Sequence, residues 1–268
     1  MSHGLPSRVT AQTAAALVVA GILASVSLAA PAAAQVNIEA QRRAPSDLGL
    51  SGTVAADLLL KTGNVEHFRV GVGGRVDYET ASTSTFLVGK GNLGLVGSNR
   101  FSNAGLVHLR HGRLLLPRLM PEAYVQVNYD EPRLLEFRAV AGAGMRVTLT
   151  DAESVGLWLG TGYMFEHERL DLPDTAIHPR TTSAHRWSSY VSGRVTAGDN
   201  LTFVATGYAQ PQVDDFADFR ILYEMNLGVS VTRALALTVG FSLRYDSRPP
   251  DDVVSLDTEL KNGIAVAF

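Results

Sequence analysis

Apolar and polar residues alternate strictly along most of this chain, and this alternation limits the folds that the chain can adopt. The clearest run is LALTVGFSLRYD at 235–246, where Leu235 and Val239 fall on one face and Thr238 and Arg244 on the other. A period of two is the pattern of a β-strand, because successive side chains of an extended backbone point to opposite sides. Beyond residue 34, no segment reaches the ~20 consecutive apolar residues of a membrane-spanning helix. The sequence therefore predicts an all-β protein.

Runs of this kind recur about twelve times, separated by turn-forming residues. The predicted strands lie near 49–60, 65–78, 83–96, 102–113, 121–130, 134–149, 153–168, 183–197, 201–210, 219–231, 235–246 and 255–268. The links at 79–82, 150–153, 198–200 and 232–234 are short, whereas those at 169–182, 211–218 and 247–254 are long. Short turns at one end and long loops at the other indicate an antiparallel meander.

Two architectures suit alternating strands, a soluble β-sandwich and a transmembrane β-barrel. The predicted strands of roughly 10 to 14 residues exceed the ~5–6 residues of typical soluble sheets and reach the ~9–11 that cross a bilayer. Their polar faces mix small residues with Arg and Glu, which suits a crowded lumen. We therefore expect a monomeric, antiparallel up-and-down transmembrane β-barrel of about 12 strands over 48–268. A soluble periplasmic β-domain is the alternative.

The first 34 residues have the layout of a secretory signal peptide, with Arg8 before an apolar stretch at 14–30 and small residues up to Ala34. Cleavage after Ala34 would leave 35–47 as an N-terminal periplasmic segment, and an uncleaved membrane anchor is the alternative. The 268 residues carry a net charge of −3, so no basic field for nucleic acid is present. We expect an outer-membrane protein of a Gram-negative bacterium, with lipid or lipopolysaccharide and the barrel assembly machinery as partners.

Charged residues gather on the predicted lumen face of the strands. The principal set is Glu136, Arg138, Arg146, Glu166, Glu168, Arg186, Arg194, Arg220, Glu224, Arg244 and Glu259, with Asp57, Arg69, Arg75, Asp77, Lys90, Arg110 and Lys261 beside it. Rings of Arg and Lys select anions, so an open lumen would form a mildly anion-preferring narrow pore. Ion pairs could instead plug the lumen, since about twelve strands lie between the filled eight-stranded barrels and the aqueous sixteen-stranded porins. Both functions stay open.

Glu166 and Glu168 stand two residues apart and so share the lumen face. Paired carboxylates can perform acid–base chemistry or bind Ca²⁺. Buried carboxylates are normally paired, however, and the next strand supplies Arg186 and Arg194 on its inward face. We expect ion pairs between these two strands.

Two pairs of residues that could carry chemistry are separated by odd spacings. His108 and His111 are three apart, as are His185 and Ser188, so neither pair shares a face of a regular strand. The sequence therefore predicts no metal site, no cofactor and no catalytic residues, and we expect no enzyme. The alternative is an outer-membrane enzyme acting on lipid or lipopolysaccharide, with a dyad built from two strands.

The chain ends in KNGIAVAF, an alternating strand that runs to the last residue. A closed barrel has to pair its last strand with its first, because an edge exposed to lipid leaves backbone groups unsatisfied. Ile264, Val266 and Phe268 would face the lipid, and we expect them to serve as an assembly signal as well.

Several stretches together resemble one bacterial family. They are LKTGNVE, LEFRAVAGAGMRV, GTGYMFEHERL, HRWSSYVSGRV, ATGYAQP and RYDSRPPDDVVSLDTELKNGIAVAF, and they extend over roughly 48–268. The resemblance is to the salt-induced outer-membrane proteins with a YdiY-like domain of unknown function. It implies an outer-membrane barrel whose expression is linked to salt or envelope stress, and it implies no substrate, cofactor or catalytic residue.

Overall fold

A computed structural model describes residues 48–62, 66–232 and 234–267 of the chain. The predicted signal peptide and the segment 35–47 therefore lie outside the described residues, as does Phe268. The strands are β1 (Gly49–Lys61), β2 (His67–Glu79), β3 (Thr83–Val96), β4 (Asn99–Arg113), β5 (Leu119–Asp130), β6 (Leu135–Asp151), β7 (Val155–Leu170), β8 (Thr181–Ala197), β9 (Leu201–Pro211), β10 (Phe219–Ser230), β11 (Leu235–Asp246) and β12 (Leu256–Ala267). A short 3-10 helix, η2 (Glu131–Arg133), joins β5 to β6.

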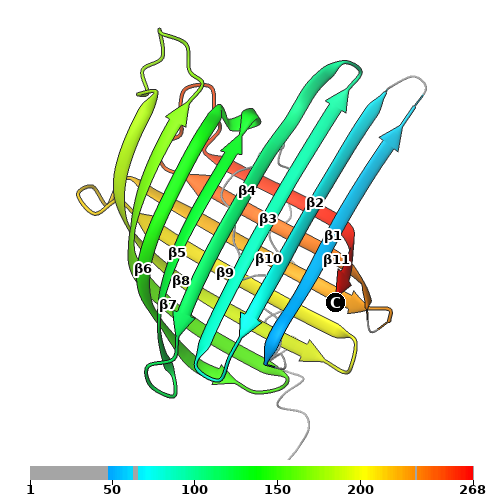
Figure 1. Cartoon of the computed structure of the whole chain (residues 1–268). Helices are drawn as coiled ribbons and strands as arrows, with labels where there is room; N and C mark the ends of the chain where they lie inside the picture. The colour runs from blue at the N-terminus through cyan, green and yellow to red at the C-terminus, as the bar shows by residue number, and fades with distance from the viewer. Residues whose placement is uncertain (1–47, 63–65, 233, 268) are drawn as a thin grey trace, which may run out of the picture. The chain divides into compact units, whose positions relative to one another are not determined.

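Each strand pairs antiparallel with its neighbours in chain order, and β12 pairs with β1 to close the barrel (Figure 1). The prediction of a closed antiparallel barrel of about twelve strands is thereby confirmed. The largest boundary difference is at β4, which begins at Asn99 rather than near residue 102. Gly97 has a φ of 58°, which allows a two-residue turn between β3 and β4 and lets pairing resume at once.

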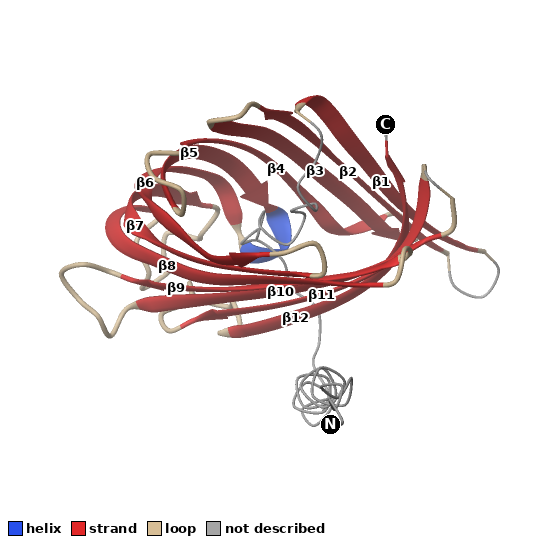
Figure 2. Ribbon diagram, turned by 90° about the horizontal axis from the view of Figure 1, so that it is seen from below, coloured by secondary structure: helices blue, strands red, loops and turns tan. Residues whose placement is uncertain are grey.

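The three long loops, β7–β8, β9–β10 and β11–β12, lie at one end of the strands, which they share with the two-residue β3–β4 turn. The β7–β8 loop rises above the rim in Figure 1, while short turns such as the one between β6 and β7 lie at the other end. Figure 2 gives a second view of the same wall, turned by 90°. No helix among the described residues is long and apolar enough to cross a membrane.

Side chains alternate between the lumen and the outer face of the wall. On β7, Leu159 and Phe165 are exposed on the outer face, whereas Trp158, Met164 and Glu166 are buried in the lumen. Large apolar side chains on the outer face and charged ones inside are the arrangement of a barrel surrounded by lipid.

Two glycines on the inner wall make room for rings from neighbouring strands. A Cβ atom added at Gly160 of β7 would overlap the ring of Tyr190, and one added at Gly142 of β6 would overlap the ring of Tyr124. Glycine inside a strand often marks such a close approach. The rings of β5 and β8 can therefore lie over the wall formed by β6 and β7, where they narrow the lumen.

Candidate functional site

The best-paired part of the lumen is a cluster that we call the ion-pair network, made of Arg138, Glu166, Glu168, Arg186 and Arg220. Glu166 accepts from all three arginines, with 3.1 Å to Arg186 Nε and 2.7 Å to Arg220 Nη1. Glu168 lies 3.1 Å from Arg138 Nε and 2.8 Å from Arg220 Nη1. All five side chains are at most 13% exposed. This part of the lumen is filled with paired charge.

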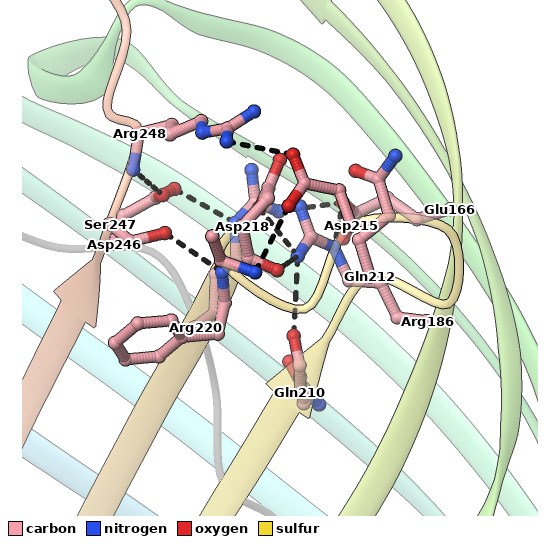
Figure 3. A network of polar contacts seen from close by, with 12 residues as sticks. Glu166, Arg186, Gln210, Gln212, Asp215, Asp218, Arg220, Asp246, Ser247 and Arg248 are labelled. Carbon is pink, nitrogen blue, oxygen red and sulfur yellow. Dashed lines mark hydrogen bonds and ion pairs between the residues drawn. The ribbon is translucent and has the colours of Figure 1, made fainter.

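The ion-pair network also fixes two loops at the same end of the barrel (Figure 3). Arg186 reaches Asp218 of the β9–β10 loop at 2.9 Å, and Arg220 reaches Asp246 at the end of β11 at 2.8 Å. Arg248 of the β11–β12 loop pairs with Asp215 of the β9–β10 loop at 2.7 Å. Contacts of this kind hold the two loops to each other and to the wall.

A second cluster narrows the lumen and is centred on Glu122 of β5. We call it the aromatic belt of the lumen, and its members are Arg110, Glu122, Tyr124, Arg146 and Tyr190. The Glu122 carboxylate accepts a hydrogen bond from Tyr190 at 3.1 Å and pairs with Arg110 at 3.3 Å and Arg146 at 3.2 Å. The Arg110 guanidinium also lies 4.9 Å from the centre of the Tyr124 ring. Cation–π contacts of this kind add to the ion pairs when the groups are desolvated.

The remaining feature is a cavity of about 230 Å³, which we call the lumen cavity. It lies between β1–β4 on one side and β10–β12 on the other, with the end of β5 beside it. Its charged lining residues are Asp57, Lys90, Asp130, Glu224, Arg244, Glu259 and Lys261. Glycines also line it, among them Gly71, Gly73, Gly240 and Gly263, so few side chains reach inward from these strands.

Three charged groups of the lumen cavity make no ion pair with another described side chain. They are Asp57, Lys90 and Asp130. Asp130 has no exposed surface, and neither of its carboxylate oxygens has a hydrogen-bond partner within the described residues. Burying a carboxyl group without a hydrogen bond is costly, so a donor from outside the described protein would lower the free energy of Asp130.

One ion pair joins the two sides of the barrel at the loop end. Arg133 of η2 pairs with Asp257 of β12, and Asp257 is only 1% exposed. Burial lowers the pKa of the Arg133 guanidinium to about 9, the nearby Arg244 lowers it as well, and Asp130 opposes both. Arg133 is still protonated at neutral pH and can hold Asp257.

The structure brings most of the predicted lumen residues together. Those buried in the lumen are Arg138, Arg146, Glu166, Glu168, Arg186, Arg194, Glu224 and Arg244, while Arg220 and Glu259 are partly buried. His108 is buried and His111 is not, and Ser188 is buried whereas His185 lies on the outer face. The odd-spacing argument is therefore confirmed for both pairs.

Two predictions about the lumen were wrong. Glu136 is exposed and pairs with Arg169, because the register shifts between Leu135 and Phe137 and turns Glu136 outward. Arg194 does not pair with the glutamates of β7. It lies 3.2 Å from Asp151 and donates to the Ala152 carbonyl at 2.9 Å, since it stands at the other end of β7 from Glu166.

The prediction missed Glu122, Asp130 and Asp257. A signal for the first two was present, because Glu122, Gln126, Asn128 and Asp130 fall on one face of β5 by period two. Asp257 pairs across the lumen with η2, and no spacing along the sequence reports such a contact.

The two described residues of the predicted assembly signal lie on the outer face of β12. Ile264 is 48% exposed and Val266 is 46% exposed, and they pair in register with Ala56 and Val54 of β1. Among the residues with described positions, no group of three or more His, Asp or Glu side chains is arranged to hold a metal ion.

Residues 54–268 match the model of a family described as proteins of unknown function, DUF481. The chain belongs to the DUF481 family. No curated protein matches it. The match covers every strand of the barrel in whole or in part, so the features described above are those of a DUF481 domain.

Three solved structures are similar to this DUF481 chain. A NanC porin is 8% identical with a TM-score of 0.48, covering 81% of this chain and 98% of that one. A KdgM porin in complex with disordered oligogalacturonate is 9% identical with a TM-score of 0.43, covering 82% and 99%. The translocator domain of the autotransporter NalP from Neisseria meningitidis is 10% identical with a TM-score of 0.42, covering 84% and 89%. The barrel fold of this chain rests on its own strand pairing.

Proposed function

We propose that this protein is a monomeric outer-membrane barrel that conducts small polar solutes along the lumen cavity. The observation that carries the proposal is the contrast inside one closed wall, where a glycine-lined cavity of about 230 Å³ lies beside a lumen filled by the ion-pair network and the aromatic belt. Membrane location is supported by the outer face, where large apolar side chains such as Leu159, Val191 and Leu237 are exposed.

The proposed pore has weak ion selectivity. The lumen cavity is lined by four carboxylates, Asp57, Asp130, Glu224 and Glu259, and by three cations, Lys90, Arg244 and Lys261. Most of the arginines that suggested anion preference are instead paired in the ion-pair network and the aromatic belt. A nearly balanced lining discriminates little between anions and cations.

A plugged, structural barrel is the second candidate. The observation that favours it is the set of ion pairs that hold the β9–β10 and β11–β12 loops to the wall and to each other. For either candidate we propose that the protein is no enzyme, and we propose expression linked to salt or envelope stress on the family resemblance described above.

Conductance of the pure protein in planar bilayers tests the pore. A Gly73→Phe variant places a ring in the lumen cavity, where an added Cβ would have its nearest neighbour at 3.6 Å, so single-channel conductance should fall by at least half. The matched control is Gly89→Phe, because Gly89 lies opposite Gly74 on the outer face and an added Cβ meets nothing within 4 Å. Absence of channel events in the unaltered protein would leave the plugged barrel.

A further inference from the structure

Among the residues with described positions, β1 and β12 pair over a much shorter length than any other two neighbouring strands. The described residues of this seam pair in register at only four positions, from Thr53 opposite Ala267 to Ala56 opposite Ile264. On its other side, β1 pairs with β2 along its full length, from Gly49 to Lys61.

The seam separates toward the loop end. A Cβ added at Gly263 would lie 3.9 Å from the Cβ of Asp57, so the two strands still adjoin at that level. Beyond it, within the part of the chain that the structure describes, residues 58–61 of β1 pair only with β2, and residues 256–262 of β12 pair only with β11. Unpaired backbone N–H and C=O groups are costly against lipid, so polar groups of water or of a ligand have to satisfy them in a bilayer.

Leucines flank this separated part of the seam. Leu58 and Leu60 on β1 are 69% and 68% exposed, and Leu260 on β12 is 65% exposed. On the lumen side, Arg69 of β2 reaches past β1 to Glu259 of β12 at 2.5 Å. The seam is therefore apolar outside and bridged by a single described ion pair inside.

The lumen cavity lies directly behind the seam. Asp57 of β1 and Glu259, Lys261 and Gly263 of β12 belong to both features. The cavity holds the three charged groups without an ion-pair partner among the described side chains, namely Asp57, Lys90 and the fully buried Asp130. Two carboxylates and one ammonium therefore belong to a cavity that lies behind the separated part of the seam.

We propose that the β1–β12 seam is a lateral portal and that the lumen cavity binds the zwitterionic head group of a membrane lipid. An ammonium group on the ligand would donate to Asp130, and a phosphate would accept from Lys90. The cavity of about 230 Å³ is smaller than the ~300–1,000 Å³ of pockets that enclose whole ligands, so the acyl chain stays outside against the leucines. The proposal rests on the membrane location proposed above and does not depend on conduction.

Disulfide trapping tests the portal, because the chain contains no cysteine. The pair Leu58→Cys with Asn262→Cys would meet if the register of the seam continued, and the control pair Val54→Cys with Val266→Cys lies in register within the paired part. In membranes, mild oxidation should cross-link the control pair almost completely and the Leu58→Cys and Asn262→Cys pair only weakly. Complete cross-linking of both pairs would show a closed seam and overturn the portal.

Lipid retention tests the head-group site, with lysophosphatidylethanolamine as the probe and native mass spectrometry as the readout. Asp130→Asn and Lys90→Met should each weaken retention about tenfold, since each removes one charge-assisted contact. The control Glu153→Gln changes an exposed carboxylate in the β6–β7 turn and should retain the probe fully. Heat-modifiable migration on a denaturing gel shows that each variant folds.

The outcomes separate this proposal from the pore. Retention of the probe without channel events would overturn the pore and keep the head-group site. Equal retention by Asp130→Asn, Lys90→Met and the unaltered protein would overturn the head-group site, whatever the conductance. Retention of lysophosphatidylglycerol as strongly as the ethanolamine lipid would overturn the role of Asp130, because that head group carries no ammonium.

Discussion

The ion-pair network and the lumen cavity are both lined by charged side chains, yet they differ in how those charges are balanced. In the network, Glu166 by itself contacts three arginines, and no side chain is more than 13% exposed. In the cavity, Asp130 is buried as completely but lacks a hydrogen-bond partner within the described residues. The strands around the network supply long complementary side chains, whereas those around the cavity supply glycines. The same barrel therefore encloses the ion-pair network, which fills its part of the lumen, and beside it the lumen cavity, which has room for a solute or ligand.

The largest expected effect comes from breaking the network at its centre. Glu166→Gln removes one of the two carboxylates that neutralise three buried arginines. Breaking a buried ion pair in this way costs about 3–5 kcal/mol of stability. Denaturant unfolding of the protein in detergent or vesicles measures the loss. Glu136→Gln is the control, because its pair with Arg169 is more than half exposed and contributes at most ~1 kcal/mol. Equal losses for the two variants would contradict the account of the network.

A second comparison uses glycines from the packed and open parts of the lumen. Gly160→Ala forces a methyl group into the Tyr190 ring, and we expect a loss of about 1–3 kcal/mol from overpacking. Gly73→Ala in the lumen cavity meets its nearest neighbour at an ordinary 3.6 Å and should change stability by less than ~0.5 kcal/mol. The same unfolding measurement applies, and a larger loss at Gly73 would mean that the cavity is packed.

The smallest expected effect is on ion selectivity. Lys90→Glu adds negative charge to the lumen cavity and should shift the reversal potential in a salt gradient toward cations. Arg248→Glu changes a half-exposed charge on the β11–β12 loop, outside the cavity lining, and should shift the reversal potential less. A larger shift from Arg248→Glu would place the selective part of the path at the loops.

How far the sequence predicts this structure depends on whether a contact is local. Period two is enough to place Glu166, Glu168 and Arg186 inside, because one alternating strand fixes the face of every residue on it. It fails at Glu136, where a register shift in β6 reverses the face and leaves no mark on the alternation. It also fails for the partner of Arg194 and for the Arg133–Asp257 pair, since those contacts depend on strand stagger and on the loop between β5 and β6.

The most direct test of an open path beside a closed plug is chemical labelling during conductance. Lys90→Cys places a thiol in the lumen cavity, whereas Ser192→Cys places one at a lumen position with no exposed surface. A membrane-impermeant methanethiosulfonate reagent should block current through the Lys90→Cys channel and leave the Ser192→Cys channel unchanged. Equal block of both channels, or block of Ser192→Cys alone, would contradict the division of the lumen described above.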